Sequence, residues 1–319
     1  MLKRCGSLIL FVFLLASCAH HSSKSPASKM KPTVSSSTQY RKVASFNKVD
    51  VQGRINVNLH TGYKKPQVIL KGDPRDLAQV KTEVRNSTVF INIGNGFPQH
   101  GAVNADVRGR FLNGVHYVGV GQINGSRLHT SVLDLSITNP GTTRLNGTIG
   151  LRKLDINGDS FVQINGVSSR NLDVHFTGAP KVQLNGFANL SRLNLDGGGW
   201  LSMYWVNSDR LVIKAKQAAK IQLAGKVNKL EVELWGRANF KGRHLRAQRT
   251  FVKTHDKSVA EISSVNHQSS LATDASDIYY YNVPNTRADF MAFNGSVLDM
   301  REWGQHDFED FTAYNKQFP

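Results

Sequence analysis

The sequence predicts an all-β protein whose main part is a parallel β-solenoid with rungs of about 20 residues. Two short motifs repeat along the stretch 122–300, and both alternate apolar with polar residues, which is typical of strands. A fixed period of this length indicates a solenoid, because one repeat is too small to bury a hydrophobic face alone. We therefore expect rungs that stack and share one interior.

The first motif ends in Asn-Gly in most copies and recurs every 19 or 20 residues. In the copy Val162-Gln163-Ile164, the first and third side chains should point inward and Gln163 outward. Stacked copies then predict one continuous inner column, made of Ile164, Leu184, Met203 and Leu223. The copies lie at 144–147, 163–166, 183–186 and 222–225, with Ser202-Met203 between the last two.

The Asn-Gly pairs predict corners of the chain. Asn and Gly both tolerate positive φ, so Asn146, Asn165 and Asn185 with their glycines should turn the chain at the same point of each rung. Two interpretations of these Asn side chains are equally open. They face solvent in a plain turn, or they point inward and bond the Asn of the next rung as a ladder.

The second motif is an apolar–polar–apolar triplet that runs in phase with the first. Its central residues Asp134, Asp155 and Asp173 are expected to share one outward position on successive rungs. Neighbouring carboxylates repel, which raises a pKa and suits acid catalysis or cation binding. We favour the alternative, a solvated acidic stripe neutralised by nearby bases. The triplets begin at Leu133, Leu154, Leu172, Leu193, Leu211 and Leu230, and the bases are Arg152, Lys153 and Arg170.

The N-terminus predicts a lipoprotein signal peptide over residues 1–17. Lys3 and Arg4 precede an apolar run that is too short to span a membrane. The following Leu15-Ala16-Ser17-Cys18 resembles the bacterial lipobox, which implies cleavage before Cys18, a lipid thioether on its sulfur and an acylated amino terminus, with palmitate as the expected acyl chain. Ala19 resembles the outer-membrane sorting pattern. The alternative is ordinary cleavage and a secreted soluble protein.

The chain after Cys18 predicts three further parts around the rungs. Residues 18–42 are basic and rich in Ser, Pro and Lys, so we expect a disordered tether. Residues 43–121 should form a small β module with one short helix at Asp73–Ala78, capped by Asp73. The aromatic and acidic residues 301–319 predict a cap over the open end of the solenoid or, alternatively, a partner-binding tail.

The β module resembles a known family. The segments 46–53, 55–57, 68–73 and 89–93, with Leu77, look like the opening of the head GIN domain, described for auto-transporter adhesin heads on envelope lipoproteins. The resemblance covers about 46–299 and implies a right-handed parallel β-helix with no catalytic residues. Two features depart from the family: Asn-Gly replaces Ser-Gly at the turns, and the Gly-rich stretch 94–121 is an irregular insertion of uncertain register.

Charge and aromatic residues give the candidate binding residues. The net charge of +17 favours an anionic partner, and nucleic acid is a poor one for an exported protein. Trp200, Tyr204 and Trp205 are candidates for stacking on sugars. A basic belt should align along the solenoid and bind an anionic polysaccharide or lipopolysaccharide, the alternative being generic surface charge. Its residues are Arg210, Lys214, Lys216, Lys220, Lys226, Lys229, Arg237, Lys241, Arg243, Arg246, Arg249 and Lys253.

These observations predict a non-catalytic envelope lipoprotein, anchored to the outer membrane through Cys18. Its expected role is adhesin-like binding of an anionic glycan or a structural role in the envelope. A polysaccharide lyase or hydrolase is the alternative from another class. The sequence contains no cofactor or metal-binding motif, and we expect neither.

Overall fold

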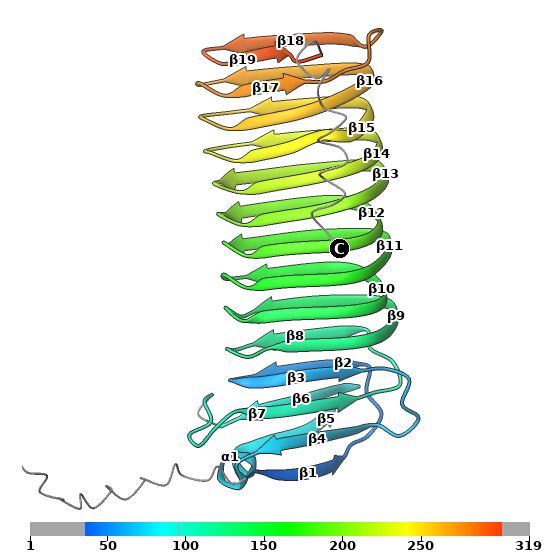
Figure 1. Cartoon of the computed structure of the whole chain (residues 1–319), viewed down its shortest axis with the longest axis vertical. Coiled ribbons are helices and arrows are strands. Elements are labelled where there is room, and N and C mark those ends of the chain that lie inside the picture. Colours follow the sequence, from blue (N-terminus) through cyan, green and yellow to red (C-terminus); the bar gives the residue numbers. More distant parts are fainter. Residues whose placement is uncertain (1–35, 95, 302–319) are drawn as a thin grey trace, which may run out of the picture. The chain divides into compact units, whose positions relative to one another are not determined.

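The computed structural model describes residues 36–94 and 96–301 (Figure 1). It is 72% strand and 2% helix, and it forms a β-solenoid of about 9 turns with rungs of ~20 residues. The predicted fold class is therefore confirmed. The expected signal peptide, the expected lipidation site Cys18 and, apart from residue 301, the expected C-terminal cap or tail lie outside the described residues.

The first part of the chain contains eight short strands and one helix. They are β1 (Ser37–Lys42), β2 (Lys48–Gln52), β3 (Ile55–His60), β4 (Gln67–Gly72), α1 (Pro74–Gln79), β5 (Val80–Arg85), β6 (Thr88–Ile93), β7 (Val103–Arg108) and β8 (Gly114–Val118). The helix confirms the one predicted at Asp73, whose side chain accepts a hydrogen bond from the Arg75 N–H. Strand β1 shows that the expected tether over 18–42 is wrong at its end, because residues 37–42 pair with β4.

The second part contains the long strands that make the rungs. They are β9 (Ile123–Thr138), β10 (Thr142–Asn157), β11 (Phe161–Gly178), β12 (Lys181–Gly197), β13 (Trp200–Gln217), β14 (Lys220–Leu234), β15 (Asn239–Thr254) and β16 (Val259–Thr273), followed by β17 (Asp277–Tyr280), β18 (Arg287–Phe293) and β19 (Ser296–Asp299). Each strand from β9 to β16 pairs in parallel with the next. Each bends midway, so the first halves stack into one sheet and the second halves into another (Figure 1).

The predicted inner column is confirmed. Ile164 pairs with Leu184, Leu184 with Met203, and Met203 with Leu223 on successive rungs. All four side chains are buried. Alternation places every second side chain of these strands inside, so identical positions stack and fill a continuous apolar interior.

The expected phase of the second motif is wrong from β9 to β13, although Leu211 and Leu230 pair as predicted. Leu154 pairs with Leu135, not with Leu133, and Asp134 therefore pairs with Lys153. The shift occurs at the bend, where the pairing is irregular between Leu151 and Lys153. A displacement by two residues keeps the same side chains inward, because the period of a strand is two. The alternation of the sequence therefore does not fix this register.

The N-terminal strands belong to the same solenoid and enter it out of sequence order. Strand β2 pairs with both β6 and β8, and β3 pairs with β7 and β9. The β2–β3 rung is thus inserted between β6–β7 and β8–β9. The stretch 94–121, expected to be irregular, contains β7 and β8. Strands β4 and β5 pair antiparallel with β7 and β6, so this part covers the N-terminal end of the solenoid.

The Asn-Gly corners form an external ladder. Asn165 Nδ2 donates to Asn146 Oδ1 at 2.7 Å, and Asn185 Nδ2 donates to Asn165 Oδ1 at 2.6 Å. Asn146 is exposed and the other two are partly exposed, so the ladder exists but does not point inward. Gly166 has a φ of 81°, and a Cβ there would lie 1.7 Å from the Gly147 carbonyl oxygen. The corner therefore requires glycine for both dihedral and space.

Candidate functional site

A basic face lies on the second halves of three neighbouring strands, β13, β14 and β15. Side chains alternate along each strand, so every second residue faces outward. Arg210, Lys229 and Arg249 are in register, as are Lys214, Glu233 and Lys253. We define the basic face by its six cations, which are Arg210, Lys214, Lys216, Lys229, Arg249 and Lys253.

Two carboxylates neutralise only part of this face. Glu231 lies 2.8 Å from Lys229 Nζ and 3.0 Å from the Arg210 guanidinium. Hydrogen bonds from Lys229 and Arg210 lower the pKa of Glu231, although its partial burial opposes the shift. Glu233 lies 3.3 Å from Lys214 Nζ. Six cations and two acids leave an excess of positive charge that is open to solvent.

The unneutralised cations of the basic face surround an aromatic ring. Arg249 and Lys253 make no ion pair within the described part of the chain. Between them on the same strand lies Phe251, whose side chain is 38% exposed. Lys229 Nζ lies 5.2 Å from the centroid of this ring, within cation–π range. A shallow depression of about 350 Å³ includes Phe251, Lys229 and Lys253.

The other six residues of the predicted belt lie elsewhere on the solenoid. Lys220 and Lys241 belong to the first halves of β14 and β15, in the other sheet. Lys226 and Arg246 are in register close to the bend. Arg237 lies in the turn before β15, and Arg243 lies over the Tyr281 ring at 5.9 Å. The coil carries consecutive residues around its circumference, so the belt does not form one face.

The three candidate sugar-stacking residues also lie apart from the basic face. Trp200 is in the first half of β13, in register between Lys181 and Lys220. Tyr204 is partly buried, whereas Trp205 is 69% exposed. Trp205 has a φ of 65° at the corner where other rungs have glycine. Left-handed backbone costs a bulky residue roughly 1–2 kcal/mol, so the chain holds this indole outward at a cost.

The expected column of three aspartates is not formed. Asp155 pairs with Ser136 and His175, while Asp134 and Asp173 flank Lys153 in the neighbouring column. The two-residue shift at the bend of β10 causes this separation. Asp155 and Asp173 nevertheless line one open depression, together with Lys153 and Arg192.

Each of these aspartates has a basic partner. Arg152 donates to Asp134, and Lys153 Nζ lies 2.6 Å from Asp155. The hydrogen bond with Asp155 and its charge raise the pKa of Lys153. The Asp173 carboxylate lies 3.5 Å from Arg192, which takes the place that the sequence suggested for Arg170.

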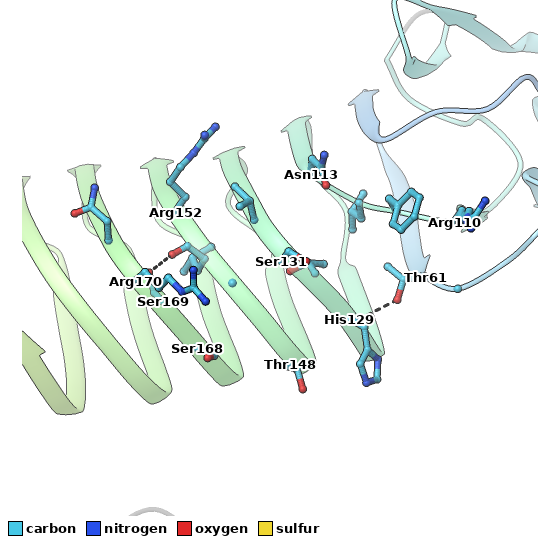
Figure 2. A pocket seen from close by; sticks show the side chains of 18 residues that line it. Thr61, Arg110, Asn113, His129, Ser131, Thr148, Arg152, Ser168, Ser169 and Arg170 are labelled. Carbon is cyan, nitrogen blue, oxygen red and sulfur yellow. Dashed lines mark hydrogen bonds between the residues drawn. The ribbon is translucent and has the colours of Figure 1, made fainter.

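A groove that the sequence did not reveal lies beside the loop 109–113. Its volume is about 920 Å³, and its far side consists of the bends of β9, β10 and β11 (Figure 2). Arg110, Arg152 and Arg170 line it, and no Asp or Glu among the described residues does. Its walls come from segments far apart in sequence. The exposed Arg110-Phe111 pair inside the Gly-rich insertion was the only local signal.

Within residues 36–94 and 96–301, no group of three or more His, Cys, Asp or Glu side chains is arranged to hold a metal ion. Over the same ranges, no helix has the length and apolar character needed to cross a bilayer.

Known structures resemble this chain at low identity. A "Putative lipid binding protein" from Parabacteroides distasonis is 14% identical, with a TM-score of 0.45 over 83% of this chain and 96% of that chain. A "putative adhesin" from the same species is 15% identical, with a TM-score of 0.46 over 84% and 98%. A "putative adhesin" from Parabacteroides merdae is 14% identical, with a TM-score of 0.48 over 83% and 95%.

The family comparison covers most of the chain. No curated protein matches the sequence. One family matches residues 45–191 and 187–284, which span the strands from β2 to β17. This agrees with the resemblance inferred from residues 46–93. The chain therefore belongs to the family described as "Putative auto-transporter adhesin, head GIN domain".

Proposed function

We propose that this protein is an adhesin-like module of the cell envelope that binds an anionic polysaccharide on its basic face, without catalysing a reaction. The observation that carries the proposal is the gathering of six cations on three successive rungs against two carboxylates. The family, whose description is an adhesin head domain, supports a binding role in the envelope.

The spacing of the face suits a repeating ligand. Arg210, Lys229 and Arg249 follow one another at the separation of neighbouring strands, about 4.8 Å. A polymer with regularly placed anionic groups can contact several of these cations at once. Such exposed ion pairs are screened by salt, so the affinity should fall as ionic strength rises. Phe251 adds an apolar contact for a sugar ring.

A non-catalytic role is supported by the partners of the aspartates. Asp134, Asp155 and Asp173 each bond a base, and Asp155 and Asp173 line one open depression together with their partners Lys153 and Arg192. A carboxylate that is ion-paired with a base is not the protonated acid that a glycosidase needs. Release of product from any polysaccharide, lost on Asp155→Asn or Asp173→Asn, would contradict this part of the proposal.

The envelope anchor is proposed from the lipobox. Cleavage before Cys18 and acylation would hold the protein at a membrane, with the outer membrane favoured by Ala19. Mass spectrometry of the N-terminal peptide should find lipid on Cys18, and Cys18→Ala should release the protein from the membrane fraction. An unmodified mature N-terminus would rule out the anchor without affecting the basic face.

The basic face has a matched control within the same strands. We expect Arg249→Gln with Lys253→Gln to weaken binding to an anionic polysaccharide such as heparin at least tenfold at low salt. Lys220→Gln with Lys241→Gln removes the same charge from the other sheet and should have a much smaller effect. A glycan array at graded salt gives the measurement. Equal losses in both variants, or binding to neutral glycans that is insensitive to salt, would overturn the proposal.

A further inference from the structure

The groove beside the loop 109–113 has a fixed wall. The Tyr63 N–H donates to the Gly109 carbonyl at 3.1 Å, and the Gly62 N–H donates to the Arg110 carbonyl at 3.1 Å. Leu112 is buried, which anchors the middle of the loop in the core. The Asn113 N–H donates to the Asn47 carbonyl at 2.7 Å. The loop is thus bonded along its length, and the groove exists before any ligand arrives.

The opposite wall is equally constrained. It is made by bends of three stacked strands, where Ser169 donates to the Leu151 carbonyl. The His129 N–H donates to Thr61 Oγ1 at 3.0 Å and ties the first bend to the end of β3 (Figure 2). A preformed site loses little entropy on binding, and ligand pockets are usually of this kind.

The charge of the groove favours an anion. Arg110 and Arg170 lie at opposite ends of it, with Ser131 between them (Figure 2). Arg170 makes no ion pair with the described residues, whereas Arg152 is held by Asp134. A guanidinium without a carboxylate partner can bind a carboxylate or sulfate through two parallel hydrogen bonds.

The remaining lining fits a sugar ring. Ser131, Thr148 and Ser168 offer hydroxyl groups, which both donate and accept hydrogen bonds. Phe111 is 57% exposed and Val132 is 39% exposed, so the groove also presents apolar surface to solvent. A sugar has the matching combination of hydroxyls and an apolar ring face. The volume of about 920 Å³ lies within the range of about 300–1,000 Å³ typical of small-ligand pockets.

We propose that this groove is a second binding site, which takes an acidic sugar such as a carboxylate-bearing residue at the end of a glycan. Arg170 binds the acid group, the hydroxyls contact the ring substituents, and Phe111 packs on the ring. The site lies on β9 to β11 and does not share a residue with the basic face on β13 to β15. Binding in this groove can therefore be tested independently of the proposed polymer binding on the basic face.

The test uses single sugars, which are too short to span the rungs of the basic face. Full-length protein is titrated with glucuronate and, in parallel, with glucose, and binding is followed by calorimetry and by the methyl resonances of Val132. We expect glucuronate to bind and to shift Val132, and glucose to bind at least tenfold more weakly. Arg170→Gln and Phe111→Ala should each weaken glucuronate binding at least fivefold.

Two controls separate this site from the rest of the surface. Arg192→Gln removes an exposed arginine from the next rung outside the groove and should leave glucuronate binding unchanged. The variant Arg249→Gln with Lys253→Gln should do the same. Failure of glucuronate to bind, equal binding of glucose, or equal loss in Arg170→Gln and Arg192→Gln would overturn the proposal, whatever the basic face does with polymers.

Discussion

The interior of the solenoid changes character along its length. In β11 to β13 the inner column consists of apolar side chains such as Ile164, Leu184 and Met203. Toward the C-terminal end, Thr250, Gln268 and other polar side chains are just as completely buried. Both interiors satisfy the same geometric rule, in which every second residue points inward. They differ in what holds one rung to the next.

The polar interior is connected by hydrogen bonds. Ser264 Oγ donates to Thr250 Oγ1 at 2.5 Å, and Asn282 Nδ2 donates to Gln268 Oε1 at 2.5 Å. Gln268 Nε2 donates to Ser270 Oγ at 2.8 Å, and the Ser264 N–H donates to Asn282 Oδ1 at 2.8 Å. A buried polar group is costly unless it is paired, and these groups are paired with one another. The rungs of a solenoid can therefore be held together by buried hydrogen bonds as well as by apolar packing.

The largest effect is expected in the apolar interior. Leu184→Ala should lower the free energy of unfolding by about 2–5 kcal/mol, because the rungs on both sides hold the cavity open. Leu184→Met preserves the volume and should cost less than about 1.5 kcal/mol. Urea unfolding of both variants gives the measurement. If Leu184→Ala cost less than Leu184→Met, close packing would not be what holds these rungs together.

The polar interior should be more tolerant of a paired change than of a single one. Gln268→Leu leaves the Asn282 Nδ2 group and the Ser270 hydroxyl without their hydrogen-bond partner, so we expect a loss of about 1–3 kcal/mol. Adding Asn282→Leu removes one of the orphaned groups, and the double variant should lose less than the sum of the two single variants. A double-mutant cycle measures this coupling. Additive losses would show that the two amides do not act as a unit.

The alternation of apolar and polar residues made the apolar interior predictable, whereas the contacts of outward side chains between rungs could not be predicted. The Gln163 motif fixed which side chains stack, because its spacing matches one turn of the coil. The separation of Asp134 from Asp155 depended on an irregularity at the bend, which conserves the alternation. Its only mark in the sequence is the uneven spacing of the triplets, which is 21 residues from Leu133 to Leu154 and 18 from Leu154 to Leu172.

The basic face and the groove could not be predicted from the sequence, because the coil decides which residues lie together. The basic residues between 210 and 253 are close in sequence, yet the coil distributes them over both sheets and the bend between them. The groove has walls from 61–62, 109–113 and three bends, so only the stacked rungs bring them together. The polar interior near Gln268 was also missed, because its pairing partner Asn282 lies on another rung.

Low pH should destabilise the N-terminal end of the solenoid and leave the apolar and the polar interior unaffected, since both interiors consist of uncharged groups. The buried Asp76 accepts hydrogen bonds from the backbone N–H groups of Gln99 at 2.9 Å and His100 at 2.7 Å. Burial alone would raise the pKa of Asp76, but the His100 side chain and these two N–H groups lower it below its ordinary value. The stability that this carboxylate contributes is therefore present above the unfolded pKa of about 3.9 and is lost as pH falls through the folded pKa.

The measurement is urea unfolding of the wild type and of Asp76→Asn between pH 6 and pH 2. We expect the wild type to be more stable at pH 6 and the difference in stability to narrow below about pH 4, where Asp76 of the unfolded chain takes up a proton before the folded carboxylate does. Gln268→Leu serves as the uncharged comparison, and its cost should not depend on the protonation of Asp76. If the difference in unfolding free energy between the wild type and Asp76→Asn stayed constant from pH 6 to pH 2, the Asp76 carboxylate would not be the source of the acid sensitivity.

The smallest effect is expected at the external Asn ladder, where the side-chain amides form their hydrogen bonds outside the coil. Asn165 bonds Asn146 on one rung and Asn185 on the next, using the same groups that join Asn282 to Gln268 in the interior. At the corner, water can replace a lost partner, so Asn165→Ala should cost about 0.5–1.5 kcal/mol, even though it removes two bonds. Urea unfolding of Asn165→Ala and of Gln268→Leu compares the loss of side-chain amide hydrogen bonds at the exposed corner with the same loss in the buried interior. If Asn165→Ala lowered the free energy of unfolding as much as Gln268→Leu does, solvent access would not explain a difference between the two kinds of amide contact. The external Asn ladder would then have to be counted among the contacts that fix the register of the rungs.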